Sequence, residues 1–174
     1  AGELGHMTID PNGPVCPCGN HGCLEAMAAG PAIAAAAIRA VSTGSSTLIR
    51  DIVDGKIEAI TAEVVSQAAA QGDLLATRLI QEAGRYLGIG IANAVNLLSP
   101  DIVIIGGGVA RAGDILFDEV RATVQKRAFT AMVNLPPILP SAQGEEASSV
   151  GAAALVFEEM LAVGSVANLM GESS

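Results

Sequence analysis

The chain has 174 residues, of which 51% are hydrophobic and 16% are charged, so it can bury a core without disulfide bonds. Its 9 basic and 18 acidic residues give a net charge of −9, and aromatic residues make up only 2%. These values exclude an intrinsically disordered chain. They also argue against direct binding of nucleic acid, which needs clustered Lys and Arg and aromatic groups for stacking. The length suits one domain or one lobe of a larger enzyme.

No stretch of the sequence predicts a membrane span or a signal peptide. The longest apolar stretch, residues 87–98, contains Asn93 and Asn96 and falls short of the ~20 residues that a bilayer requires. We therefore expect a cytoplasmic protein without a membrane partner. The chain opens at Ala1 without an initiator Met, which we interpret as a fragment whose upstream part was removed. The alternative is a mature protein that is cut at this point.

The first predicted elements are a loop and an Ala-rich helix. Residues 1–30 are rich in Gly and Pro and contain all three cysteines, which predicts a loop region. A helix is predicted over residues 31–41, because Pro31 is well suited to the first helical position. Residues 42–46 predict a turn. Residues 49–60 mix apolar and charged side chains, so their pattern is ambiguous.

Two further helices have clear N-cap residues. Thr61 precedes a predicted helix over residues 62–70, and Asp73 precedes the longest predicted helix, which runs to Leu98. Ser99 and the proline after it end that helix. Three glycines in its interior each cost up to about 1 kcal/mol, which indicates close approach of a neighbouring backbone or ligand: Gly84, Gly88 and Gly90.

The second half of the chain predicts a parallel α/β layer. Residues 101–105 form a continuous apolar, β-branched run, which is typical of a strand buried on both faces. A glycine triplet, residues 106–108, follows this strand. After it come a helix over 114–131, a short extended segment led by the prolines of 136–140, a polar turn at 144–149 and a helix over 150–161. This strand–helix–strand–helix order favours parallel strands.

Four potential metal ligands lie close together near the N-terminus: His6, Cys16, Cys18 and Cys23. Their number and chemistry suit one tetrahedral Zn2+, which would be structural because no coordination position is left open. Glycines at 13, 19 and 22 allow the tight wrapping that such a site needs. The spacing is not that of a standard zinc finger, so three buried or free cysteines remain the alternative. His21 is a rival ligand, which we expect to be exposed in the tight turn between the last two cysteines.

The same loop resembles a known family. Residues 3–6 read Glu-Leu-Gly-His, residues 10–14 read Asp-Pro-Asn-Gly-Pro, and residues 16–25 read Cys-Pro-Cys-Gly-Asn-His-Gly-Cys-Leu-Glu. In this order they resemble the zinc-binding signature of the ROK family, whose name stands for repressors, uncharacterised reading frames and sugar kinases. Residues 99–108 and 150–154 also resemble segments of that family, so the resemblance covers essentially the whole chain.

The resemblance implies an α/β fold, the C-terminal lobe of an actin-like ATPase (ribonuclease H-like) with a zinc-binding loop. It divides residues 1–174 into a zinc- and sugar-binding loop at 1–30, a helical part at 31–98 and a nucleotide-binding α/β part at 99–174. In the family, the phosphate-binding Asp-x-Gly loop and the catalytic Asp lie in an N-terminal lobe, upstream of residue 3. We therefore expect no catalytic residue in this chain, and no kinase activity from this chain alone.

The resemblance also assigns binding roles. Glu3, His6 and Glu25 would hold the sugar, and His6 would ligate zinc as well. Gly106, Gly107 and Gly108 would approach the adenosine and inner phosphates of ATP, which the complete protein would use with Mg2+. Taken without the resemblance, the two carboxylates are ordinary solvated side chains, and the glycine triplet is equally well a tight turn.

Three functions follow as hypotheses. The first is part of an ATP-dependent hexose kinase similar to glucokinase, supplying sugar-binding and adenosine-binding residues. The second is the effector-binding part of a sugar-responsive transcriptional repressor of the same family. The third is a non-catalytic module stabilised by zinc. The expected ligand is a hexose or an N-acetylhexosamine, and the resemblance implies a homo-oligomer, for which the Ala-rich helix at 31–41 offers a packing face.

Overall fold

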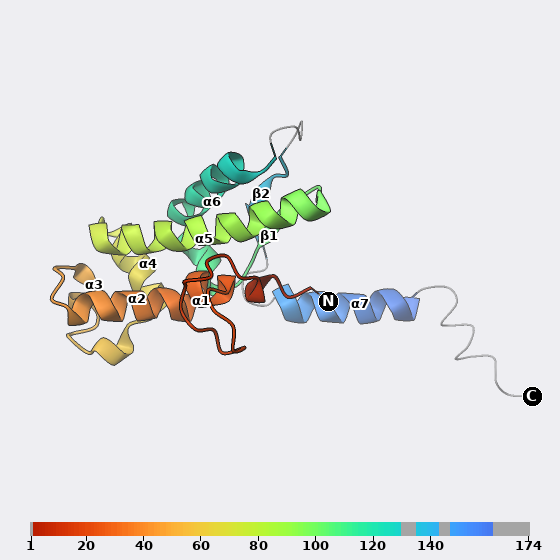
Figure 1. The fold of residues 1–174 in the computed structure, drawn as a ribbon. Coiled ribbons are helices and arrows are strands. Elements are labelled where there is room, and N and C mark those ends of the chain that lie inside the picture. The colour runs from red at the N-terminus through yellow and green to blue at the C-terminus, as the bar shows by residue number, and fades with distance from the viewer. Residues whose placement is uncertain (1, 130–134, 143–146, 162–174) are drawn as a thin grey trace, which may run out of the picture.

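A computed structural model describes residues 2–129, 135–142 and 147–161 of the chain. Figure 1 shows several helices packed around one long helix, with a small sheet at one end. The long helix is α5 (Leu74–Leu98), and it packs against α6 (Asp114–Arg127), α4 (Ala62–Ala70), α2 (Gly30–Ser42) and α1 (Leu24–Ala28). Because α5 touches every one of these helices, it is the centre of the fold.

The predicted N-caps begin the two helices as expected. The Thr61 side chain accepts a hydrogen bond from the Val64 N–H, and α4 has the predicted bounds. The Asp73 carboxylate accepts bonds from two backbone N–H groups, those of Ala76 and Leu48, each at 2.7 Å. Asp73 therefore caps α5 and also ties it to the start of a helix distant in the sequence. Ser99, in the left-handed conformation with φ of 46°, ends α5.

The ambiguous segment at 49–60 forms two short helices rather than one long one. These are α3 (Leu48–Ile52) and a 3-10 helix (Ile57–Ala59). Thr47 caps α3 by accepting a hydrogen bond from the Ile49 N–H at 3.2 Å. Gly55, with φ of 77°, turns the chain between the two helices. Charged and apolar residues alternate irregularly here because neither helix is long enough to show a helical period.

The glycines of α5 face neighbouring helices. A Cβ at Gly88 would lie 2.6 Å from the Cβ of Thr123, and one at Gly84 would lie 2.9 Å from the main-chain oxygen of Leu116. Both neighbours belong to α6, so these glycines let α5 and α6 pack closely. The third glycine, Gly90, meets the Leu24 side chain of α1. The predicted close approach is thus confirmed, and it is made by helices.

The hydrophobic core lies between α5 and the helices around it. Its largest fully buried apolar residues come from α3, α4, α5 and α6, and they are Ile49, Val65, Ile80, Val95, Leu116, Val120 and Val124. Alanines of α2, α4 and α5 fill the remaining contacts, which lets the helices lie close together. Burial of this kind is the dominant favourable contribution to folding.

Strands β1 (Val103–Ile105) and β2 (Ile138–Pro140) are parallel, with Val103 opposite Ile138. The connection through α6 confirms the predicted α/β layer. The expectation that the first strand is buried on both faces is wrong for this chain: Ile104 is 61% exposed, whereas Ile105 is 9% exposed. In the part that the structure describes, the core covers one face of this two-stranded sheet, so alternate residues face solvent.

The C-terminal elements differ from prediction at their ends. Helix α6 ends at Arg127 rather than at 131, and the Asn96 side chain of α5 accepts a hydrogen bond from the Phe129 N–H at 2.8 Å just beyond it. Helix α7 (Ala147–Leu161) begins three residues before the predicted position, and residues 144–146 of the expected polar turn lie outside the described part. Helix α7 extends away from the body (Figure 1). Among the described helices, none has the length and apolar character that crossing a membrane would require.

Candidate metal and ligand site

The N-terminal loop is folded back on itself by main-chain hydrogen bonds. The Cys16 N–H donates to the Asn20 oxygen at 2.7 Å, and the Gly19 N–H donates to the Cys16 oxygen at 2.9 Å, which closes a tight turn around Cys18. An antiparallel bridge pairs Thr8 with Cys23. Together these bonds bring the segment after His6 alongside the last cysteine, although 17 positions separate those two residues.

Two glycines of the loop are required by its geometry. Gly22 has a φ of 60°, and a Cβ there would overlap the main-chain carbonyl of Asp10. A Cβ at Gly13 would lie 2.7 Å from the Cα of Gly22. Any side chain at these positions would force the two arms of the loop apart. The sequence-based prediction that these glycines permit tight wrapping is therefore confirmed.

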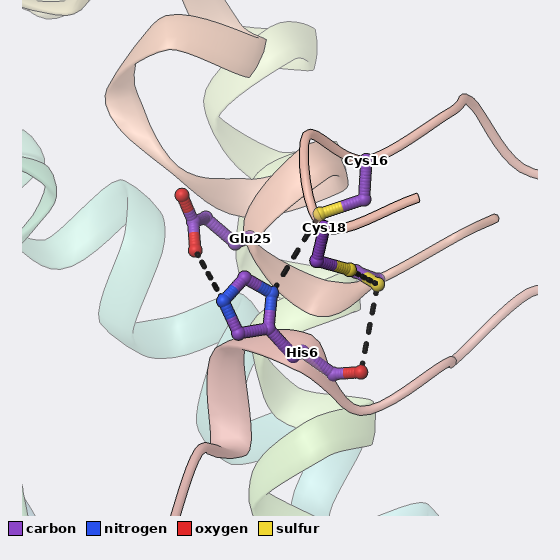
Figure 2. A network of polar contacts seen from close by, with 5 residues as sticks. His6, Cys16, Cys18 and Glu25 are labelled. Carbon is purple, nitrogen blue, oxygen red and sulfur yellow. Dashed lines mark hydrogen bonds and ion pairs between the residues drawn. The ribbon is translucent and has the colours of Figure 1, made fainter. Parts of the chain in front are cut away.

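The four predicted ligands converge. The ligand atoms of His6, Cys16, Cys18 and Cys23 all lie within 4.8 Å of one another. The Nδ1 atom of His6 is 3.6 Å from Cys16 Sγ, and the Sγ atoms of Cys18 and Cys23 are 3.7 Å apart (Figure 2). A tetrahedral zinc site with ordinary bond lengths has sulfur–sulfur edges of about 3.8 Å and sulfur–nitrogen edges of about 3.6 Å. The cluster therefore has the donor set and the spacing to hold one tetrahedral Zn2+.

Burial differs among the three thiols. Cys16 and Cys23 are 1% and 0% exposed, whereas Cys18 is exposed. Burial raises the pKa of Cys23 to about 12, and the neighbouring thiols add to the rise. A hydrogen bond from the backbone of Asn20 lowers the pKa of Cys18. A divalent cation among the sulfurs would favour the thiolate form of all three, because a coordinating thiol loses its proton.

His21 lies outside this cluster. It is exposed, its main-chain oxygen accepts a hydrogen bond from the Thr8 hydroxyl, and its N–H donates to the Asn20 side chain at 2.9 Å. The Asn20 side-chain amide in turn donates to Thr8. The backbone of His21 thus shapes the loop, and the expectation that its side chain is exposed is confirmed.

The second ring nitrogen of His6 faces Glu25. Its Nε2 atom is 3.9 Å from Oε2 of Glu25, which stands in the first turn of α1. Figure 2 shows the imidazole between the sulfur cluster on one side and this carboxylate on the other. The two side chains are 39% and 52% exposed, so both remain accessible to a ligand. One ring nitrogen can therefore serve a metal while the other serves a polar ligand.

Glu25 also lines a cavity of about 320 Å³ that reaches the glycine turn. Gly5 and Glu25 line it together with Gly106 and Val109. Its remaining lining is apolar and comes from four separate segments: Leu4, Leu24, Ala28, Ala29, Leu87 and Ile105. These apolar residues cannot be picked out from the sequence, because their pattern is indistinguishable from that of ordinary core positions.

Four other predicted site residues do not line this cavity: Glu3, His6, Gly107 and Gly108. Gly107, with φ of 79°, stands before a 3-10 helix (Gly108–Ala112), and a Cβ there would meet nothing within 4 Å. The turn is thus open on that side. Glu3 is exposed and does not line the cavity. Its main-chain oxygen accepts from the His6 N–H at 3.1 Å at the start of a 3-10 helix (Leu4–His6).

Comparisons with known proteins agree with this arrangement. The chain is 35% identical over 158 residues to a glucokinase of Thermotoga maritima, covering 91% of this chain and 50% of that protein. It is 34% identical over 160 residues to the DNA-binding transcriptional dual regulator NagC of Escherichia coli K12, covering 92% of this chain and 38% of that protein. The chain thus spans half or less of the length of these curated relatives.

A solved structure matches the fold as well. The crystal structure of a ROK family glucokinase from Streptomyces griseus in complex with glucose and AMPPNP superposes with a TM-score of 0.81 at 31% identity. The match covers 89% of this chain and 51% of that one. The sequence model of the ROK family matches residues 1–159 of this chain. With the loop, the parallel layer and these matches in agreement, the chain belongs to the ROK family.

Proposed function

We propose that this chain is the sugar- and nucleotide-holding part of an ATP-dependent hexose kinase similar to glucokinase. One observation carries the proposal: a single cavity is lined by both Glu25 and Gly106. A carboxylate suits sugar hydroxyls, and an open glycine turn suits close approach of a nucleotide. A kinase needs both ligands in one cleft, because phosphoryl transfer depends on their alignment.

The proposed zinc site would be structural. His6, Cys16, Cys18 and Cys23 would hold the ion, which would supply rigidity and no open position for chemistry. The loop around it contains little apolar surface that could hold it in shape otherwise. By fixing His6, the site would keep the Nε2 atom directed toward Glu25, 3.9 Å away. The chain's own part in sugar binding would then be a preorganised pair of polar groups.

The sugar would be held by hydrogen bonds and by apolar contact. The Glu25 carboxylate would accept hydrogen bonds from hydroxyl groups, and His6 Nε2 would offer a further polar contact beside it. The Leu24 and Leu87 side chains in the cavity would contact the C–H face of the ring. Glu3 would join them only if its exposed side chain turned toward the ligand. A hexose or an N-acetylhexosamine fits this combination.

The general base of the proposed reaction would belong to the other half of a complete kinase. The Asp10 carboxylate is engaged by the Asn12 N–H at 3.0 Å, and the Asp73 carboxylate caps α5. Neither group faces the cavity between Glu25 and Gly106. Since the chain spans half of the related glucokinase, the base and the remaining phosphate contacts would come from the other half.

The test is a coupled assay of ADP release on a full-length protein that carries this chain, with glucose, mannose, fructose and N-acetylmannosamine. We expect turnover with one of these sugars and none from the 174-residue chain alone. Glu25→Gln should raise the KM for the sugar by about 10- to 100-fold, as expected for loss of a charge-assisted hydrogen bond. Glu82→Gln is the matched control, since Glu82 bonds Tyr86 outside this cavity.

A repressor is the second candidate, because 92% of this chain aligns with NagC at 34% identity. The same assay separates the two functions. Sugar binding without ADP release by the full-length protein would favour the effector-binding role. Robust turnover by the isolated chain would contradict the placement of the base in the other half.

A further inference from the structure

Two of the loop thiols are placed to react with each other. The Sγ atoms of Cys18 and Cys23 lie 3.7 Å apart, and the four residues between them include Gly19 and Gly22, both with positive φ. This short segment turns back on itself and so holds the two sulfur atoms close together. To reach the disulfide bond length of about 2.05 Å, the two sulfurs must approach each other by about 1.7 Å.

The two thiols differ in access to solvent. Cys18 is exposed at the tip of the tight turn, whereas Cys23 is fully buried at the start of α1. A small oxidant would therefore react with Cys18 first. Cys23 lies next to it and would act as the resolving thiol. Cys16 is a weaker partner for two reasons. Its sulfur lies 3.6 Å from His6 Nδ1. In addition, only one residue separates it from Cys18, so a disulfide between these two cysteines would close a strained ring.

We propose that Cys18 and Cys23 are a reversible oxidation site, at which a hydroperoxide forms a disulfide and releases the loop metal. The disulfide itself needs no metal, whereas the release rests on the zinc site of the proposed function. This would make the loop a redox-sensitive element in addition to a structural one.

The chemistry balances with hydrogen peroxide as the oxidant. The sulfur of Cys18 attacks one peroxide oxygen, the O–O bond breaks, and a sulfenic acid and one water form. The sulfur of Cys23 then attacks that of Cys18, the S–O bond breaks, and the hydroxyl leaves as a second water with the Cys23 proton. Two thiols lose two electrons in total, and the peroxide accepts them. A dithiol reductant reverses the step.

The consequence for the site passes through His6. With two of four ligands joined to each other, Cys16 and His6 alone would hold the ion, and two ligands bind zinc much more weakly than four. The imidazole, no longer fixed by a metal, would lose its alignment with Glu25, 3.9 Å away. Oxidation of the loop would therefore weaken ligand binding in the cavity that Glu25 borders.

The experiment treats the 174-residue chain with hydrogen peroxide, with and without added Zn2+, and then blocks the free thiols without reduction. All three cysteines fall in the tryptic peptide 1–39, because Arg39 is the first Lys or Arg of the sequence. Mass spectrometry should show this peptide with one blocked thiol and with two hydrogen atoms fewer than a peptide whose other two thiols are free. Fragment ions should place the disulfide between Cys18 and Cys23. A zinc indicator should report about one ion released per disulfide, and dithiothreitol with Zn2+ should restore the starting state.

Single substitutions identify the pair. Cys16→Ser keeps both proposed partners and should still lose two hydrogens, whereas Cys18→Ser and Cys23→Ser should not. Fragment-ion mapping of the wild-type peptide gives the same answer if a variant fails to fold. A Cys16–Cys18 disulfide, or Cys18 advancing to sulfinic acid with no disulfide, would overturn the proposal. Disulfide formation at the proposed pair in a chain that never binds zinc would uphold the oxidation site and refute only the structural zinc.

Discussion

The N-terminal loop and the helical body are stabilised by different means. Within residues 2–23, the buried positions are Cys16, Gly22 and Cys23, so the loop has almost no apolar core of its own. The body, from α2 to α6, is held by a continuous set of buried hydrophobic residues around α5. The comparison shows that burial stabilises the body, whereas turn hydrogen bonds and two required glycines shape the loop.

This difference matters for function because the cavity lies between the two regions. Gly5 and Glu25 belong to the loop and the helix that follows it, whereas Gly106 follows a strand of the α/β layer. A ligand in the cavity therefore contacts residues of the loop and of α1 as well as residues of the α/β layer. Perturbing either region alone should separate their contributions.

The largest effect is expected on metal content. Replacing Cys16 and Cys23 together by Ser should lower bound zinc from about one equivalent to below about 0.1, because two oxygen donors bind zinc poorly in place of thiolates. The helical signal in circular dichroism should persist, since the core around α5 contains neither residue. Elemental analysis after gel filtration measures the first quantity. Collapse of the helices in the double variant would mean that the two regions do not fold separately.

The second effect tests the body. Leu116→Ala removes a fully buried side chain of α6 and should lower the free energy of unfolding by about 2–5 kcal/mol. Leu97→Ala is the control, because that side chain of α5 is 79% exposed and its loss should cost below about 0.5 kcal/mol. Urea titration followed by circular dichroism measures both. Zinc content per folded molecule should not change, and a proportional loss of zinc would contradict the comparison.

The third effect concerns the cap that joins α5 to α3. Asp73→Ala should lower the free energy of unfolding by about 0.5–2 kcal/mol at pH 7, because two backbone N–H groups lose their acceptor. Burial raises the pKa of Asp73, but hydrogen bonds from the backbone of Ala76 and Leu48 outweigh it, so the pKa is lowered in the folded state.

The sign of the pH dependence follows from that lowered pKa. The carboxylate stabilises the fold fully above its unfolded pKa of about 3.9, and the contribution disappears as the pH falls through the lower folded value. The difference between wild type and Asp73→Ala should therefore be constant near neutrality and shrink in acid. Unfolding curves at pH 7, 4 and 2.5 measure it. A difference that grows below pH 4 would contradict the assignment of Asp73 as an ionised cap.

The smallest effect is expected at the second histidine. His21→Ala should leave zinc content unchanged, because the His21 side chain lies outside the cluster and only its backbone shapes the loop. His6→Ala is the contrasting variant, and it should lose most of the metal. Equal losses in both variants would show that the ligand set differs from the one that the geometry supports.

The sequence determined the elements that depend on neighbouring residues. Thr61 and Asp73 predicted the starts of α4 and α5, because a cap bonds an N–H group only three residues away. The crowding of His6 with three cysteines likewise predicted, from chemistry and spacing alone, that these four side chains form a cluster. Local interactions of this kind can be read from the order of residues, and the structure places both caps and the cluster as predicted.

Only the tertiary structure decided which distant residues meet. Ile104 faces solvent although its strand reads as buried, because the exposure of a sheet face depends on what packs against it. The partners of Gly84 and Gly88 lie on α6, about 30 positions away, and no local pattern identifies them. The cavity joining Glu25 to Gly106 is likewise assembled from segments far apart in the chain, so packing between helices, rather than local preference, creates it.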